Sequence, residues 1–212
     1  MGSVLLVRHG QASAGAADYD QLCELGMLQA QHLGYAWEAS GWRPTLAVSG
    51  SMKRHHQTAI ATLDALGDVD GYDVDADWNE LDLEPLLEKY PTSSGEAVPA
   101  SQLTFAERTK SWSEGGPGGR ETFVEFRDRV LAAFGRACTE AGSGRTVVVF
   151  TSGGPIAMVA THLLGGDAQM WRRLAPVVIN ASVTTAISGS KGQTLIAFNE
   201  HMHLPASDVT YH

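Results

Sequence analysis

Short apolar segments alternate with longer amphipathic segments along the chain. Residues 3–7 form an apolar run that ends in a polar, glycine-containing turn, which is typical of a strand buried on both faces of a parallel sheet. From Thr122 onwards apolar residues recur at helical spacing, and Thr122 with Glu125 forms a predicted capping box. By the same criteria we expect further strands at 45–49, 145–151, 177–187 and 194–198, and further helices at 23–39 (closed by Gly41), 52–66 and 155–164 (with Pro155 in the first turn).

This order of strands and helices predicts an α/β fold. We expect a three-layer sandwich around a mostly parallel sheet, in which ligands bind beyond the carboxyl ends of the strands. Residues 1–212 are expected to form a single domain. The segment 81–120 is rich in proline and includes the glycine-rich stretch 115–119, so it is predicted to be an insert or lid. Phe105 and Trp112 either line that lid or belong to a small helix packed on the core.

Composition and charge narrow the range of partners. The 212 residues include 24 acidic and 15 basic ones, a formal net charge of −9. This charge disfavours a nucleic-acid-binding surface, whereas a local group of arginines can still hold a small anion. With only Cys23 and Cys138, no disulfide framework or cysteine-rich zinc site is expected. The N-terminus does not resemble a signal peptide and no apolar run approaches the roughly 18 residues of a membrane span. We therefore expect a cytoplasmic protein with neither a nucleic-acid nor a membrane partner.

Candidate chemistry begins at Arg8-His9-Gly10, directly after the first predicted strand. A histidine at that place can face a ligand, and Gly10 allows close approach of the backbone. On these three residues alone, a solvated turn whose arginine pairs with an acidic neighbour is an equal alternative.

Four segments extend this motif and carry a family resemblance. LLVRHGQAS at 5–13, YDQLCELGMLQA at 19–30 and SGSMKRHHQTA at 49–59 agree in order and spacing with motifs of the histidine phosphatase superfamily. RTVVVFTSGGPI at 145–156 matches a further family segment. The chain thus resembles this family, also called phosphoglycerate-mutase-like, towards both ends and departs from it in the insert. The resemblance implies a phosphoglycerate-mutase-like fold.

The resemblance also implies a role for each matching residue. An imidazole nitrogen of His9 would attack a phosphoryl group and form a phosphohistidine, which water later hydrolyses. Arg8 and Arg54 would hold the phosphate oxygens, because guanidinium groups bind phosphate bidentately and stay charged. Glu80 falls where the family places its proton donor, with Asp82 as the rival, and a bound phosphate anion would favour the protonated carboxyl group.

One position departs from the family pattern. Most members carry a second histidine in a His-Gly-Gly turn, whereas this chain has Ser152-Gly153-Gly154. A hydroxyl can donate a hydrogen bond to phosphate but brings no positive charge, so some catalytic loss is expected. Gly153 opens the following helix, whose N-terminal amides and dipole favour an anion. His201 or His203, just past the last predicted strand, is an alternative substitute for the missing histidine.

Two more histidines, His55 and His56, follow Arg54 on the same predicted helix. Adjacent residues lie about 100° apart around a helix, so at most one of the two faces the site. Neither this pair nor the later pair lies in an HExxH-like context, so no metal ion and no other cofactor is expected.

The sequence favours a phosphatase among three functions. The Asn-rich, Trp-containing stretch of glycolytic mutases is missing after the RHG motif, and Gln11 and Ser13 stand there as predicted substrate contacts. A phosphoglycerate-mutase-type phosphotransferase is one alternative. A catalytically impaired protein that binds a phosphorylated ligand is another, because of Ser152. Expected partners are a small phosphorylated substrate or a phosphoprotein, whereas the sequence leaves open whether the chain forms a homodimer.

Overall fold

A mixed β-sheet lies at the centre of the structure. The computed structural model describes residues 1–13, 20–67, 71–81, 90–91, 97–98, 105–116 and 120–211, with the backbone alone at 90–91, 97–98 and 105–108. Within these residues six strands form the central sheet, in the spatial order β3 (Asp73–Val74), β2 (Leu46–Ser49), β6 (Thr146–Thr151), β1 (Gly2–Arg8), β7 (Val183–Gly189) and β8 (Gly192–Glu200). Two short strands, β4 (Tyr90–Pro91) and β5 (Ala97–Val98), pair separately.

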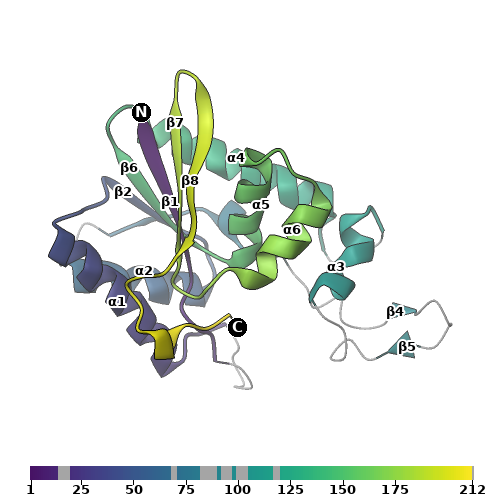
Figure 1. Cartoon of the computed structure of the whole chain (residues 1–212), viewed down its shortest axis with the longest axis horizontal. Coiled ribbons are helices and arrows are strands. Elements are labelled where there is room, and N and C mark those ends of the chain that lie inside the picture. The colour runs from purple at the N-terminus through teal and green to yellow at the C-terminus, as the bar shows by residue number, and fades with distance from the viewer. Residues whose placement is uncertain are drawn as a thin grey trace.

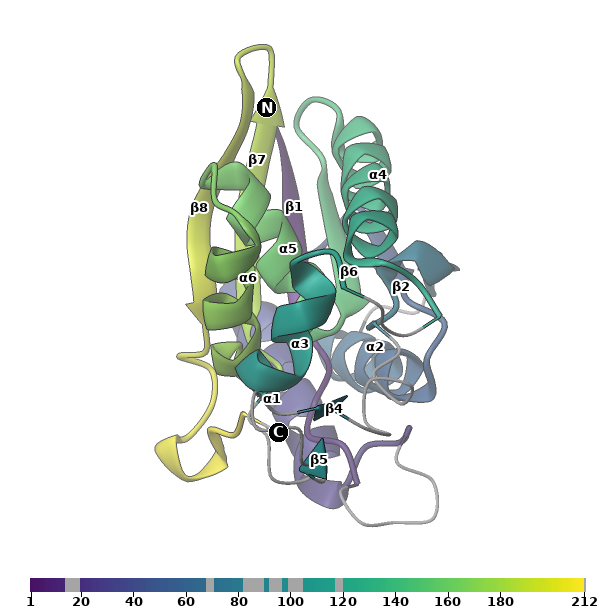
Figure 2. The ribbon, with the colours of Figure 1, turned by 90° about the vertical axis from the view of Figure 1, so that its right-hand side faces the viewer.

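Helices lie on both faces of this sheet. They are α1 (Glu24–Ser40), α2 (Lys53–Leu66), α3 (Phe105–Ser113), α4 (Phe123–Ala141), α5 (Gly153–Leu163) and α6 (Ala168–Leu174), with 3-10 turns η1 (Ala76–Trp78), η4 (Ala175–Val177) and η5 (Ala206–Asp208). Figures 1 and 2 show α1 and α2 side by side on one face, with α4 and α5 on the other. No helix in the described part of the chain is both long enough and apolar enough to cross a bilayer.

The strands of the sheet run mostly in parallel. β1 pairs in parallel with β6, and β2 and β3 continue the parallel part beyond β6. On its other side β1 pairs antiparallel with β7, which forms a hairpin with β8. The predicted α/β sandwich with a mostly parallel sheet is therefore confirmed.

Side chains of the central strands alternate between two cores. Val4 and Leu6 of β1 lie in the core shared with α4 and α5, whereas Leu5 and Val7 lie in the core shared with α1 and α2. β6 repeats this alternation. Burial on both faces explains why these strands are continuous apolar runs in the sequence.

Helix ends follow their sequence signals. Gly41 ends α1 with φ 69°, a left-handed conformation that favours glycine. Thr122 and Glu125 form the predicted capping box at the start of α4, with both reciprocal hydrogen bonds present. α5 begins at Gly153, slightly before the predicted start, and keeps Pro155 in its first turn.

The strand predicted at 177–187 is wrong over its first half. After η4 the chain crosses the carboxyl end of the sheet as a loop, and β7 begins only at Val183. In this loop Ala181 has φ 56°, outside the range of a strand, and its amide donates to the carbonyl oxygen of Arg8 at 3.1 Å. Val178 is buried in the loop. The apolar residues that suggested a strand therefore bury a loop against the end of β1.

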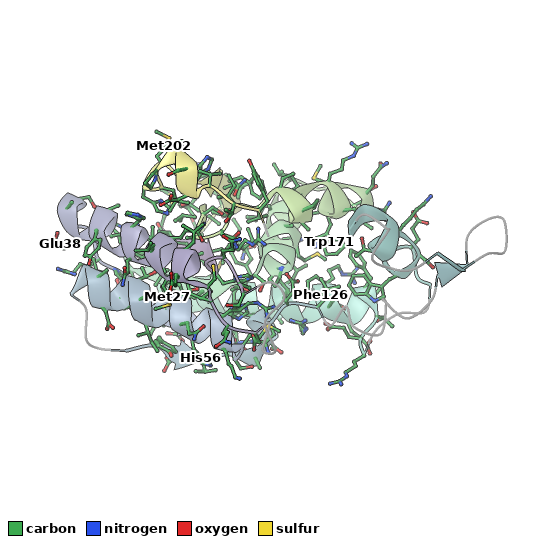
Figure 3. The ribbon with its side chains drawn as sticks, turned by 90° about the horizontal axis from the view of Figure 1, so that it is seen from below. Met27, Glu38, His56, Phe126, Trp171 and Met202 are labelled. Carbon is green, nitrogen blue, oxygen red and sulfur yellow. The ribbon has the colours of Figure 1, made fainter. Side chains whose placement is uncertain are left out.

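The predicted insert at 81–120 falls only partly within the described residues. Trp112 of α3 is buried, with its ring centroid 5.8 Å from those of Phe126 and Trp171. Figure 3 labels Phe126 and Trp171 on the side of the molecule that carries α3. Of the two alternatives for Trp112, the structure has the helix packed on the core. The side chain of Phe105 lies outside the described residues, and the single domain and its insert stay predictions.

Candidate active site

The carboxyl ends of β1 and β6 bring two of the sequence motifs together. Arg8 pairs with Thr151 in the parallel register, and the amide of His9 donates to the carbonyl oxygen of Thr151 at 2.8 Å. His9 and Ser152 each come directly after one of these neighbouring strands. They therefore lie at the edge of the sheet where α/β folds of this kind bind ligands.

The ring of His9 is buried in a defined tautomer. Its Nδ1 lies 2.7 Å from the carbonyl oxygen of Gly10, and because a carbonyl oxygen can only accept, Nδ1 carries the hydrogen. Nε2 keeps the lone pair. Burial, followed by the positive charges of Arg54 and Arg8, lowers the pKa of His9 well below its ordinary value. The ring is uncharged at neutral pH, and its Nε2 is available as a nucleophile.

Two guanidinium groups act on His9. Arg8 donates from Nη1 to the carbonyl oxygen of Val178, in the loop that replaces the predicted strand. Arg54, in the first turn of α2, is buried and pairs with Asp20 at 2.7 Å. The positive charges of both side chains lower the pKa of His9, and the same positive potential at its ring favours the binding of an anion.

Glu80 lies at the N-terminus of α5. Its Oε2 accepts a hydrogen bond from the amide of Gly154 at 3.0 Å. A Cβ at Gly154 would overlap Oε1 of Glu80, so a larger residue there would displace this carboxylate. The hydroxyl of Thr151 donates to the carbonyl oxygen of Trp78 at 2.5 Å, which ties the segment before Glu80 to the end of β6. Asp82, the rival proton donor, lies outside the described residues.

Ser152 is hydrogen-bonded to a histidine of α2. Nε2 of His55 lies 2.7 Å from Oγ of Ser152, and both side chains are buried. The ring centroid of His55 is 5.8 Å from that of His9. His56 is directed elsewhere, with its Nδ1 at 3.0 Å from the hydroxyl of Tyr72, and Figure 3 shows it at the edge of the molecule. Of the adjacent pair, His55 therefore faces the site.

The spacing of apolar residues along α2 indicates which of the two histidines faces inward. His55 precedes the buried residues Ala59 and Leu63 by one and two helical turns. His56 is in the same phase as Ile60, which is 46% exposed. The apolar positions of α2 thus indicate which histidine turns inward.

His201 and His203 form a different group. Burial lowers the pKa of His203 to about 4, and the charges that act on it are those of His201 and His32. The histidine that acts on His9 is His55. The role of the tail histidines as substitutes for the missing one stays a prediction. Within the described ranges, His, Cys, Asp and Glu side chains form no group of three that could hold a metal ion.

Two loops complete the surroundings of His9. Gln11 and Ser13 lie on the loop that leaves β1, where the amide of Gln11 donates to Oε1 of Gln29 at 2.8 Å. Asn180, which the sequence did not single out, donates from Nδ2 to the carbonyl oxygen of His9 at 3.1 Å. No motif signals Asn180, because its role depends on the loop that takes the place of the predicted strand.

Comparison with known proteins assigns the chain to a family. The chain matches the histidine phosphatase superfamily (branch 1) over residues 4–201. The chain belongs to the histidine phosphatase superfamily. The family resemblance that its motifs carry is thereby confirmed.

The relatives of this chain include phosphatases. A glucosyl-3-phosphoglycerate phosphatase from Mycolicibacterium vanbaalenii is 30% identical over 182 residues, which cover 79% of this chain and 76% of that protein. A phosphoserine phosphatase variant from Entamoeba histolytica, solved with phosphoserine, has a TM-score of 0.70 at 18% identity and covers 97% of this chain and 100% of its own. A phosphoglycerate mutase from Bacillus anthracis has a TM-score of 0.73 at 19% identity, covering 95% and 94%. The expected phosphoglycerate-mutase-like fold is confirmed.

Proposed function

We propose that this histidine phosphatase hydrolyses a phosphomonoester through a phosphohistidine intermediate on His9. The observation that carries the proposal is the lone pair on Nε2 of His9, which the Nδ1 hydrogen bond to Gly10 assigns to that atom. This uncharged nucleophile lies near the fixed positive charges of Arg8 and Arg54. Such a combination suits attack on an anionic phosphoryl group, because the cations draw the substrate in and the ring stays able to attack it.

The reaction proceeds in two steps. First, Nε2 attacks the phosphorus atom, the ester P–O bond breaks, and the leaving oxygen takes a proton from Glu80. Second, water attacks the phosphorus atom, the P–N bond breaks, and Glu80 takes up a proton from the water. Arg8 and Arg54 hold the phosphoryl oxygens in both steps. The Ser152 hydroxyl and the amide of Gly153, at the N-terminus of α5, donate further hydrogen bonds to them.

The relative at 30% identity supports hydrolysis rather than transfer of the phosphoryl group. This relative is a phosphatase, and its name supplies glucosyl-3-phosphoglycerate as a first candidate substrate. Gln11 and Ser13 would contact the part of the substrate beyond its phosphate. Both cysteines, Cys23 and Cys138, are free thiols, which fits the reducing cytoplasm.

Turnover of an aryl phosphate by the purified protein tests this proposal. We expect His9→Ala to lower kcat by at least about 10³-fold, because the covalent route needs that ring. Acid-labile phosphohistidine should be trapped on the wild-type protein and be absent from His9→Ala. His56→Ala is the matched control and should keep wild-type turnover, since His56 is directed to Tyr72.

Each other outcome has a definite meaning. Turnover that survives in His9→Ala would exclude the phosphohistidine route. A wild-type protein that binds inorganic phosphate but hydrolyses neither aryl phosphate, glucosyl-3-phosphoglycerate, phosphoserine nor 3-phosphoglycerate would be the phospho-ligand binder. Conversion of 3-phosphoglycerate to its 2-phospho isomer would identify a mutase.

A further inference from the structure

Ser152 and His55 form a buried pair beside His9, in the place where most family members carry a histidine. We propose that the Ser152 hydroxyl donates a hydrogen bond to the transferring phosphoryl group, and that His55 is the positioning residue that aims this hydroxyl. The inference rests on the proposed function of the same site. It assigns the role of the second histidine jointly to Ser152, which follows β6, and to the imidazole of His55 in α2.

The hydroxyl of Ser152 does not serve the helix that it begins. Ser152 is the N-cap of α5, yet its side chain makes no capping hydrogen bond. An N-cap serine usually accepts from the second or third amide of the helix. Here the second amide, that of Gly154, donates to Glu80, and the third residue is Pro155, which has no amide hydrogen. The hydroxyl is directed to His55 instead.

The surroundings of His55 determine its hydrogen positions. Burial, followed by the charge of Arg54, lowers the pKa of His55 well below its ordinary value, so the neutral ring carries one N–H group. Among the described residues Nδ1 of His55 is buried without a hydrogen-bond partner. A buried donor is left unpaired more rarely than a buried acceptor, which puts the hydrogen on Nε2. Nε2–H then donates to Oγ of Ser152, and the hydroxyl hydrogen is left to donate to a phosphoryl oxygen.

The chain also makes room for this imidazole. A Cβ at Gly50 would overlap Nδ1 of His55, so only glycine leaves the ring its space. Gly50 cannot easily move away, because its amide donates to the carbonyl oxygen of Phe150 at 3.0 Å. At the Nε2 edge of the ring, the small side chain of Ser152 leaves enough space for the imidazole. The ring is thereby held between Gly50 and Ser152, next to His9.

Two substitutions of His55 separate positioning from packing. His55→Leu fills much of the same volume without a donor, whereas His55→Gln can place an N–H group near the position of Nε2. We expect Ser152→Ala and His55→Leu each to lower kcat for aryl phosphate by about 10–10²-fold. KM should stay within about threefold in both, since the arginines still bind the ground state. His55→Gln should recover most of the lost rate, and His56→Leu should leave it unchanged.

The double variant tests whether the two residues act as one unit. If His55 acts through Ser152, His55→Leu/Ser152→Ala will be no slower than Ser152→Ala alone. Two results would overturn the inference while leaving the phosphatase proposal in place. One is a double variant whose loss in kcat equals the product of the two single losses, and the other is a His55→Gln rate as low as that of His55→Leu. Circular dichroism and thermal melting confirm that each variant is folded.

Orthovanadate binding keeps the inference testable without turnover. Orthovanadate adopts the five-coordinate geometry of phosphoryl transfer, so its calorimetric Kd reports the same hydrogen bond. We expect Ser152→Ala and His55→Leu to weaken its binding by about tenfold or more and His55→Gln to weaken it less. An inactive wild type with this binding pattern would refute the proposed hydrolysis but not the pair. An equal Kd in all variants would refute the pair itself.

An exchange of residues gives an independent readout. In Ser152→His the new imidazole meets His55, so we expect no gain in kcat from this change alone. With His55→Ala added, space opens for the new ring, and kcat should rise by about tenfold over the single variant. If kcat rises in Ser152→His and adding His55→Ala does not raise it further, the side chains at 152 and 55 do not compete for the same space, and the inference is overturned.

Discussion

His9 keeps an uncharged ring beside two guanidinium groups. The cations and the burial of the ring act in the same direction, since each disfavours a second positive charge at this place. The hydrogen bond from Nδ1 to Gly10 favours the charged form, but it ranks below the opposing effects. The arrangement thus supplies positive charge for a phosphate group while preserving the lone pair that attacks it.

This balance predicts how His9 titrates. Because its pKa is lowered, the ring should stay neutral as the pH falls from about 8 to about 6, where an ordinary histidine with a pKa near 6.5 gains its proton. ¹⁵N NMR of histidine-labelled protein measures this, and His9→Gln assigns the resonance. The same protein unfolded in urea gives the unperturbed reference. A His9 midpoint at or above about 6.5 would contradict the account of the nucleophile.

Only part of the site could be predicted at this scale. Arg8 and His9 follow directly after a strand whose apolar run is unmistakable, so the sequence places them at the ligand-binding edge. His55 was left undecided, although the phase of Ala59 and Leu63 contains the answer. Asn180 could not be found, because its contact with His9 depends on how distant segments fold together.

At the scale of elements, buried strands and capped helices were the predictable parts. β1 and β6 are continuous apolar runs because helices cover both faces of the sheet. The start of α4 is predictable from its capping box. The strand predicted at 177–187 is wrong over 177–182, because the apolar residues there belong to a loop that closes over the end of β1, whereas 183–187 are part of β7. An apolar run in the sequence is the same for a buried strand and for a buried loop whose amides hydrogen-bond to the carbonyl oxygens of Arg8 and His9.

Arg129 of α4 links two of these elements. It donates to the carbonyl oxygens of Asp77 and Asn79 at 2.9 and 2.8 Å, and to the carboxylate of Glu121 at 2.6 Å. The carbonyls belong to the segment that leads directly into Glu80. Arg129 therefore holds the proposed proton donor in place from outside the site.

Removing this link should affect both stability and catalysis. In Arg129→Met the carbonyl oxygens lose charged donors, so we expect the free energy of unfolding to fall by about 2 kcal/mol. Because Glu80 loses its support, kcat should fall by about tenfold with little change in KM. Arg136→Met is the matched control on the same helix, since Arg136 is 51% exposed and its pairs with Asp75 and Asp77 are surface ion pairs worth under about 1 kcal/mol. Urea denaturation and steady-state kinetics measure both effects, and equal losses in the two variants would contradict the assigned link.

The whole molecule encloses several histidines in neutral form. His9 and His55 are buried at the carboxyl edge of the sheet, and His203 lies within the C-terminal segment that follows β8. That segment packs on α1, where Nε2 of Gln29 donates to the carbonyl oxygen of Asp208 at 2.7 Å (Figure 1). The pKa values of all three histidines are lowered in the fold. On unfolding, the pKa of each histidine returns to its ordinary value, so the free energy of unfolding depends on pH.

The free energy of unfolding should therefore fall on mild acidification. The part that comes from His203 can be measured by substituting this residue. Its pKa is about 4 in the fold and near 6.5 in the unfolded chain, so between these values the unfolded state binds more protons. The stability contribution is full above about pH 6.5 and is lost as the pH falls towards 4; His203 alone should cost about 2 kcal/mol between pH 7 and pH 5. Urea denaturation at the two pH values should show a smaller loss in His203→Gln by that amount. Met202→Gln, a change at the 94% exposed neighbour that Figure 3 labels, should keep the wild-type loss. An unaltered loss in His203→Gln would mean that His203 titrates alike in the folded and unfolded chain.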